Sequence, residues 1–117
     1  MTGHELSSLV RYGASPLVFV LNNRGYTTER FIHEGPYNDL HQWAYHLIPQ
    51  LLRRGRGFEV RTEGDLERVL AAVRPAPRGF TIVNVHLHPL DRSAALERLT
   101  RRLGQRAALP RRGGGTA

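Results

Sequence analysis

The sequence of 117 residues contains no cysteine, which excludes disulfide bonds, thiolate metal sites and a cysteine nucleophile. It also lacks a long hydrophobic stretch: apolar runs such as 17–21 are far shorter than the roughly 20 residues that a membrane helix needs. Met1 is not followed by a basic and then apolar leader. We therefore expect one small soluble domain, cytoplasmic and without a membrane partner.

Lysine is the other missing residue type, so all 17 basic residues are arginines, and the formal net charge is +7. The stretch 98–117 holds six of these arginines and no acidic residue, so the basicity belongs mainly to the C-terminal end. This distribution argues against nucleic acid as a partner, and it leaves a basic, polyanion-binding module as one alternative function. We expect residues 104–117 to form a disordered basic tail.

Hydrophobic periodicity and turn residues predict alternating helices and strands. The predicted helices run from near Met1 to Gly13 and over 39–52, 62–73 and 92–103, and the predicted strands are 17–21, 58–61 and 80–87. Helix 39–52 would bury Trp43, and helix 92–103 would turn Leu96, Leu99 and Leu103 inward. The run 17–21 is apolar on both faces, which is typical of a buried parallel strand. Alternation of strands and helices predicts an α/β fold with a parallel sheet.

A polar segment, residues 22–33 with the sequence NNRGYTTERFIH, follows the first predicted strand. Open parallel sheets bind ligands beyond the carboxyl ends of their strands, so a site is expected there. Carboxamides and hydroxyls can supply oxygen ligands to Mg²⁺, although Asn-Asn-x-Gly is also ordinary turn chemistry. His86 and His88 share a strand face, but they lack a third metal ligand in the sequence pattern.

The exact residues of this segment are more specific than the general pattern of polar side chains after a strand. Residues 21–33, LNNRGYTTERFIH, are followed by 35–40, GPYNDL, and by Trp43. Together they resemble the C-terminal diphosphate-binding domain of thiamine diphosphate-dependent 2-oxo acid decarboxylases, above all the pyruvate and indolepyruvate decarboxylase group. The resemblance runs from about Thr2 to Leu103, so residues 1–103 are expected to form part of such a domain.

The resemblance implies a cofactor site on the turn after the strand. The carboxamide of Asn23 and the backbone carbonyl of Gly25 would hold the Mg²⁺ that anchors the cofactor diphosphate. Tyr26 and Thr27 would also bind thiamine diphosphate. An octahedral metal that bridges protein oxygens and phosphate suits this role chemically.

The resemblance also implies a catalytic group. Glu29 would be the acid that assists decarboxylation and later protonates the enamine, and Thr28 and Ile32 would line the pocket for the 2-oxo acid. Without the family match, Glu29 reads as a solvated carboxylate in the first turn of a helix, where the helix dipole favours it.

The sequence departs from the family in two respects. The family motif begins with Gly-Asp-Gly, whose aspartate is a further metal ligand, and alignment places that motif just upstream of Met1; the pyrimidine-binding domain is also missing. We expect an incomplete domain without its first strand, inactive alone, whose partner is a second copy or a complementary N-terminal chain. The uncovered strand 17–21 predicts self-association. A fragment of a thiamine diphosphate-dependent carboligase or synthase is a further alternative.

Overall fold

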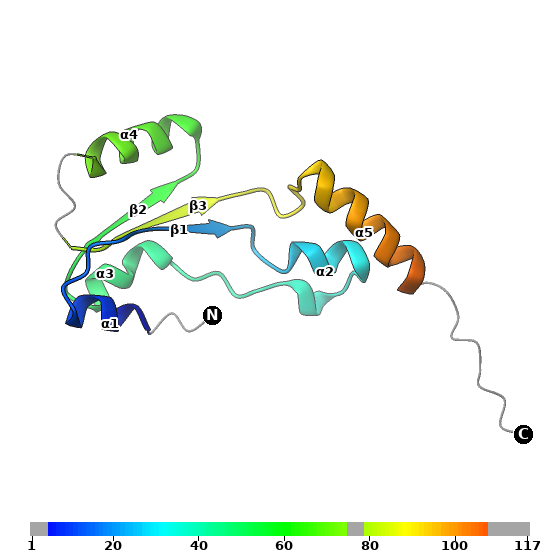
Figure 1. The fold of residues 1–117 in the computed structure, drawn as a ribbon, viewed down its shortest axis with the longest axis horizontal. Helices are drawn as coiled ribbons and strands as arrows, with labels where there is room; N and C mark the ends of the chain where they lie inside the picture. The colour runs from blue at the N-terminus through cyan, green and yellow to red at the C-terminus, as the bar shows by residue number, and fades with distance from the viewer. Residues whose placement is uncertain (1–4, 75–78, 108–117) are drawn as a thin grey trace, which may run out of the picture. The chain divides into compact units, whose positions relative to one another are not determined.

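A computed structural model of the chain describes residues 5–74 and 79–107. Within it the chain divides into two compact units. The first unit contains the residues up to Asn22 and Gln42–Leu87, and the second contains Asn23–His41 and the residues from His88 onward. Figure 1 labels the helices and strands of both units. Over the described ranges, no helix combines the length and the apolarity that are needed to cross a bilayer.

The first unit is a parallel three-stranded sheet with helices, as the sequence predicts. The strands lie in the order β1-β3-β2, and β1 and β2 both run parallel to the central strand β3 (Figure 1). In chain order its elements are α1 (Leu6–Arg11), β1 (Leu17–Asn22), η3 (Tyr45–Leu47), α3 (Ile48–Leu51), β2 (Arg56–Val60), α4 (Glu63–Val73) and β3 (Thr81–His86). The predicted start of the first helix near Met1 lies outside the described residues.

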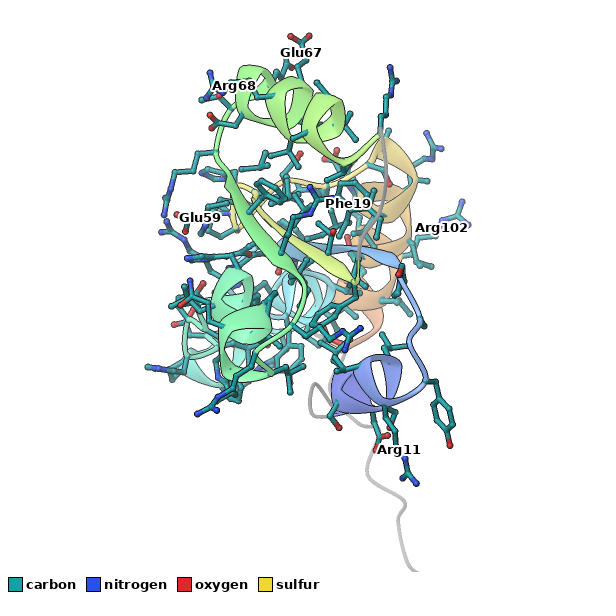
Figure 2. All side chains as sticks on the ribbon, turned by 90° about the vertical axis from the view of Figure 1, so that its left-hand side faces the viewer. Arg11, Phe19, Glu59, Glu67, Arg68 and Arg102 are labelled. Carbon is teal, nitrogen blue, oxygen red and sulfur yellow. The ribbon has the colours of Figure 1, made fainter. Side chains whose placement is uncertain are left out.

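The core of the first unit lies between α4 and the sheet. Its buried members are four valines: Val60, Val69, Val73 and Val83. Three partly buried apolar side chains pack against them: Phe58, Leu66 and Val85. Thr62 caps α4 by accepting a hydrogen bond from the Asp65 amide, and the Asp65 carboxylate accepts one from the Thr62 amide. Glu67 and Arg68 lie on the outer side of α4 (Figure 2). The predicted helix 62–73 is thus confirmed.

The predicted helix 39–52 is wrong. Residues 39–44 are not helical, and only the short elements η3 and α3 follow them. Pro49 stands in the first turn of α3, where its missing N–H costs nothing. Trp43 is 63% exposed and stacks on Tyr45 instead of entering a core.

Strand β1 is less buried than the sequence predicts. Phe19 pairs in register with the fully buried Val83, yet Phe19 is 42% exposed and Leu21 is 67% exposed. Residues that pair across two parallel strands point to the same face of the sheet, so Phe19 lies on the same face as Val83. On that face α4 packs against Val60 of β2 and Val83 of β3, whereas the side chains of β1 stay exposed. The expected self-association through this strand stays a prediction.

The second unit packs α2 (Thr27–Ile32) against α5 (Ala94–Ala107), with η2 (Pro36–Asn38) beside α2. The closest approach uses small residues of α5: Thr100 is 2% exposed, and a Cβ on Gly104 would lie 3.3 Å from the carbonyl oxygen of Phe31. The Arg92 guanidinium lies 3.7 Å above the centre of the Phe31 ring, a cation–π contact.

Helix α5 corrects two predictions. It continues to Ala107, so residues 104–107 are helical and not part of a disordered tail; residues 108–117 lie outside the described part. Leu99 is 54% exposed rather than inward. The buried line of the helix instead follows Leu96, Thr100 and Gly104, because the small side chains admit α2 more closely than leucine would.

Candidate functional site

The residues that the family resemblance singles out lie in the second unit, on the turn 23–26 and on helix α2. Asn23 is half-buried, and its amide Nδ2 donates to the Thr27 hydroxyl at 2.7 Å. That hydroxyl donates in turn to the carbonyl oxygen of Pro89 at 3.0 Å. The chain of bonds fixes which end of the Asn23 carboxamide faces Thr27, and it leaves the oxygen Oδ1 toward the turn, 3.5 Å from the Gly25 nitrogen.

The turn holds one unusual backbone conformation, at Arg24, and one crowded position, at Gly25. Arg24 has φ +65°, a left-handed conformation that residues other than glycine seldom adopt. Gly25 is buried, and a Cβ there would lie 2.2 Å from the Asn38 carbonyl oxygen and 2.5 Å from Arg30 Nη2, so no larger residue fits. Strain and close approach of this kind are typical of loops that hold a ligand.

A bridge holds the turn against the segment 38–40. Gly25 and Asp39 form an isolated antiparallel bridge. Its two hydrogen bonds come from the residues beside them: the Tyr26 amide donates to the Asn38 carbonyl at 2.9 Å, and the Leu40 amide donates to the Arg24 carbonyl at 3.2 Å. Neither bond uses the Gly25 carbonyl, the oxygen for which the resemblance implies metal binding.

An open hollow lies beside the turn and has a volume of about 380 Å³. It is lined by Tyr26, Glu29, Ile32, His33, Tyr37 and Asn38. The structure thus brings together three residues singled out in the sequence, one each for cofactor, catalysis and substrate: Tyr26, Glu29 and Ile32. Thr28, the other expected pocket residue, does not line the hollow. Within this lining, the His33 and Tyr37 rings stack with centres 6.0 Å apart, and His33 Nδ1 contacts the Tyr37 hydroxyl.

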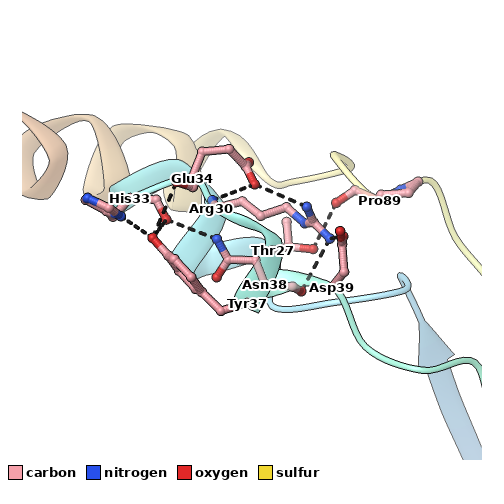
Figure 3. A network of polar contacts seen from close by, with 9 residues as sticks. Thr27, Arg30, His33, Glu34, Tyr37, Asn38, Asp39 and Pro89 are labelled. Atoms are coloured by element: carbon pink, nitrogen blue, oxygen red, sulfur yellow. Dashed lines mark hydrogen bonds and ion pairs between the residues drawn. The ribbon is translucent and has the colours of Figure 1, made fainter.

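Sequence reasoning missed a polar network around Arg30 (Figure 3). Arg30 contacts Glu34 and Asp39 as well as the Asn38 carbonyl, and the Asn38 side chain, 1% exposed, donates to the His33 carbonyl at 3.0 Å. Asp39 raises the pKa of Arg30 through their hydrogen bond, so the guanidinium stays charged. The four-residue spacing of Arg30 and Glu34 in the sequence was the available signal, but the partners at 38 and 39 depend on tertiary contact.

The oxygen atoms around the turn are of the kind that a hard cation binds, but they are too few to fill its coordination shell by themselves. Asn23 Oδ1 and the Gly25 carbonyl are neutral oxygens, which Mg²⁺ accepts beside water and phosphate oxygens. Across residues 5–74 and 79–107, no group of three or more His, Asp or Glu side chains is placed to hold a metal ion. His86 pairs with Glu59 at 2.8 Å, and His88 accepts a hydrogen bond from the Leu90 amide at 3.2 Å.

No family model matches the chain, whereas curated relatives do. It is 34% identical to pyruvate decarboxylase 1 of Pisum sativum over 82% of its own length, and 33% identical to pyruvate decarboxylase of Aspergillus fumigatus over 83%. It is 36% identical to alpha-keto-acid decarboxylase of Mycobacterium leprae over 86%. The chain spans 17% to 18% of these relatives' own lengths.

These similarities make the chain a homologue of decarboxylases over most of its length. More narrowly, the homologues are pyruvate decarboxylases and alpha-keto-acid decarboxylases, which agrees with the resemblance carried by residues 21–43.

Proposed function

We propose that this chain is the diphosphate-binding part of a thiamine diphosphate- and Mg²⁺-dependent 2-oxo acid decarboxylase. Its role is to bind the metal and the cofactor diphosphate on the turn 23–26 and to present Glu29 to the reacting carbon. The observation that carries this proposal is that Tyr26, which directly follows Asn23–Gly25 in the turn, lines the same hollow as Glu29 and Ile32. Similarity to decarboxylases that act on pyruvate or other alpha-keto acids supports the same reading.

Each residue has a definite task in this proposal. Asn23 Oδ1 and the Gly25 carbonyl would hold Mg²⁺, and the Thr27 hydroxyl fixes the Asn23 carboxamide by accepting a hydrogen bond from its amide Nδ2. Thiamine diphosphate, when bound, supplies the nucleophilic carbon and the electron sink that loss of CO₂ requires. Glu29 exchanges a proton at its carboxyl group, and Ile32 excludes water from the apolar part of the substrate.

The proposal assigns binding, not turnover, to the chain as it stands. The described turn would offer two protein oxygens to the metal, so we expect weak, metal-dependent affinity and no decarboxylation of pyruvate. Completion of a catalytic site would need a complementary chain or a second copy.

The test is a calorimetric titration of the purified chain with thiamine diphosphate, with and without Mg²⁺. We expect binding that needs the metal and that Asn23→Ala weakens at least about tenfold, since the variant loses one of two protein ligands. Gln105→Ala is the matched control because it also removes an exposed carboxamide from the second unit, away from the turn. A folded wild-type chain that binds no cofactor, or binding that Asn23→Ala leaves unchanged, would overturn the proposal.

A further inference from the structure

The side chain of Arg30 is buried to an extent that is unusual for a charged group on a short surface helix. It is 11% exposed, whereas its two carboxylate partners, Glu34 and Asp39, are 60% and 69% exposed. Its Nε is buried and has no hydrogen-bond partner among the described residues. Burial of a guanidinium is costly, so the position of this group calls for an explanation beyond the surface pair with Glu34.

The guanidinium lies directly against the turn that carries the proposed metal ligands. Nη2 is 2.5 Å from the point that a Cβ on Gly25 would occupy, so the absence of a side chain there makes room for Arg30. The same Nη2 donates to the Asn38 carbonyl at 3.3 Å and contacts the Asp39 carboxylate. The Asn38 carbonyl also accepts the Tyr26 amide at 2.9 Å, so one oxygen links Arg30 to the backbone next to Gly25.

We propose that Arg30 is a positioning residue for Mg²⁺: by holding the Asn38 carbonyl and Asp39, it fixes the backbone of Gly25 so that the Gly25 carbonyl faces the metal. This inference rests on the proposed function and deepens it. Arg30 touches neither substrate nor cofactor in this role and acts only through the segments 24–26 and 38–40. Groups that orient a metal ligand from behind commonly contribute 10- to 100-fold to metal affinity.

The two carboxylates provide a built-in comparison. Asp39 belongs to the bridge with Gly25, whereas Glu34 lies one turn further along the chain from Arg30, outside that bridge. Loss of either carboxylate removes one ion pair of Arg30 and one negative charge. Only loss of Asp39 should disturb the turn, so Glu34→Gln is the matched control for Asp39→Asn.

The experiment is a titration of Mg²⁺ into the full chain at a fixed concentration of thiamine diphosphate, followed by calorimetry. We expect Arg30→Gln and Asp39→Asn to raise the Mg²⁺ concentration at half-saturation about tenfold, and Glu34→Gln to change it less than about twofold. At saturating Mg²⁺ the affinity for thiamine diphosphate should stay within about twofold of wild type in all variants, because a filled metal site restores the turn. Arg30→Lys keeps the charge beside Asp39 but loses the forked guanidinium, so it should recover only part of the metal affinity.

Amide hydrogen exchange gives a second readout that needs no ligand. The amides of Tyr26 and Leu40 make the two bridge hydrogen bonds, and we expect both to exchange about tenfold faster in Arg30→Gln, with the amides of α5 unchanged. If the wild-type chain binds no cofactor while these amides respond, the proposed function fails and the positioning of Gly25 stands. Unchanged exchange and an unchanged Mg²⁺ dependence would overturn the role of Arg30. A parallel loss of metal and cofactor affinity, even at saturating Mg²⁺, would overturn it too, since general destabilisation has that signature.

Discussion

Substitution of Gly57 by alanine is the sharpest test of the packing in the first unit. Gly57 lies in β2, and a Cβ on it would stand 1.7 Å from the carbonyl oxygen of His46 and 2.7 Å from its carbonyl carbon. Ordinary contact begins at 3.4 Å, so the backbone of η3 must move away from the sheet by well over 1 Å. A backbone atom cannot swing aside as a flexible side chain does, and the strain must therefore spread through η3.

The cost follows from what η3 covers. Gly57 pairs in register with Ile82, whose side chain points to the same face and is fully buried. Overpacking of a tight contact costs about 1–3 kcal/mol, and partial exposure of Ile82 adds about 1 kcal/mol. We expect Gly57→Ala to lower the free energy of unfolding by about 2–4 kcal/mol.

Urea unfolding followed by circular dichroism measures this change, and Gly64→Ala is the control. A Cβ on Gly64, in the first turn of α4, would meet only the Thr62 hydroxyl at 3.9 Å. The same added methyl group should there stabilise the chain by about 0.4–1 kcal/mol, because alanine loses less entropy than glycine on folding. A Gly57→Ala variant as stable as wild type would refute the close packing of η3 on β2.

Three further predictions concern the first unit. Thr62→Ala should lower the free energy of unfolding by about 1 kcal/mol in urea titrations, since the cap of α4 is lost, and a change below about 0.3 kcal/mol would speak against that cap. The hydrogen bond from His86 lowers the pKa of Glu59, so the Glu59 carboxylate contributes its full stabilisation of the fold above the ordinary glutamate pKa of about 4.3 and loses it as the pH falls further. The difference in free energy of unfolding between wild type and Glu59→Gln should therefore shrink below about pH 4.3. A difference that stays constant with pH would contradict this. Leu21→Glu should reduce self-association in sedimentation velocity runs, because it places a charge on the exposed face of β1; equal association in both proteins would exclude that face.

Local signals explain why much of the first unit could be predicted. Thr62 with the apolar residues that follow it marks a helix start by short-range rules, and the structure places a cap and α4 there. Strands alternating with helices predicted the parallel sheet, and β1, β2 and β3 follow that pattern. None of these inferences required knowledge of contacts between distant residues.

The region 39–44 could not be predicted in this way. Leu40, Trp43 and Leu47 recur at helical spacing, yet the backbone near Asp39 pairs with Gly25, a partner far away in the sequence. A bridge to the turn and a helix beginning at Asp39 compete for the same backbone groups, and the tertiary contact prevails. The burial of Arg30 could not be predicted either, because it depends on a tertiary contact between the turn and the residues Asn38 and Asp39.

The carboxamide of Asn23 illustrates how the proposed site depends on both kinds of information. The resemblance in sequence implies that Asn23 binds the metal through its carboxamide oxygen, a kind of ligand that Mg²⁺ accepts. Its orientation comes from Thr27, whose hydroxyl accepts the Asn23 amide and donates to the Pro89 carbonyl, 62 residues further along the chain. A hydroxyl that must donate to Pro89 has only its lone pairs left for Asn23, so it admits the NH₂ end of the carboxamide and excludes the oxygen. The long-range bond therefore keeps the Asn23 oxygen, which accepts the Gly25 amide at 3.5 Å, toward the turn where we propose that Mg²⁺ binds.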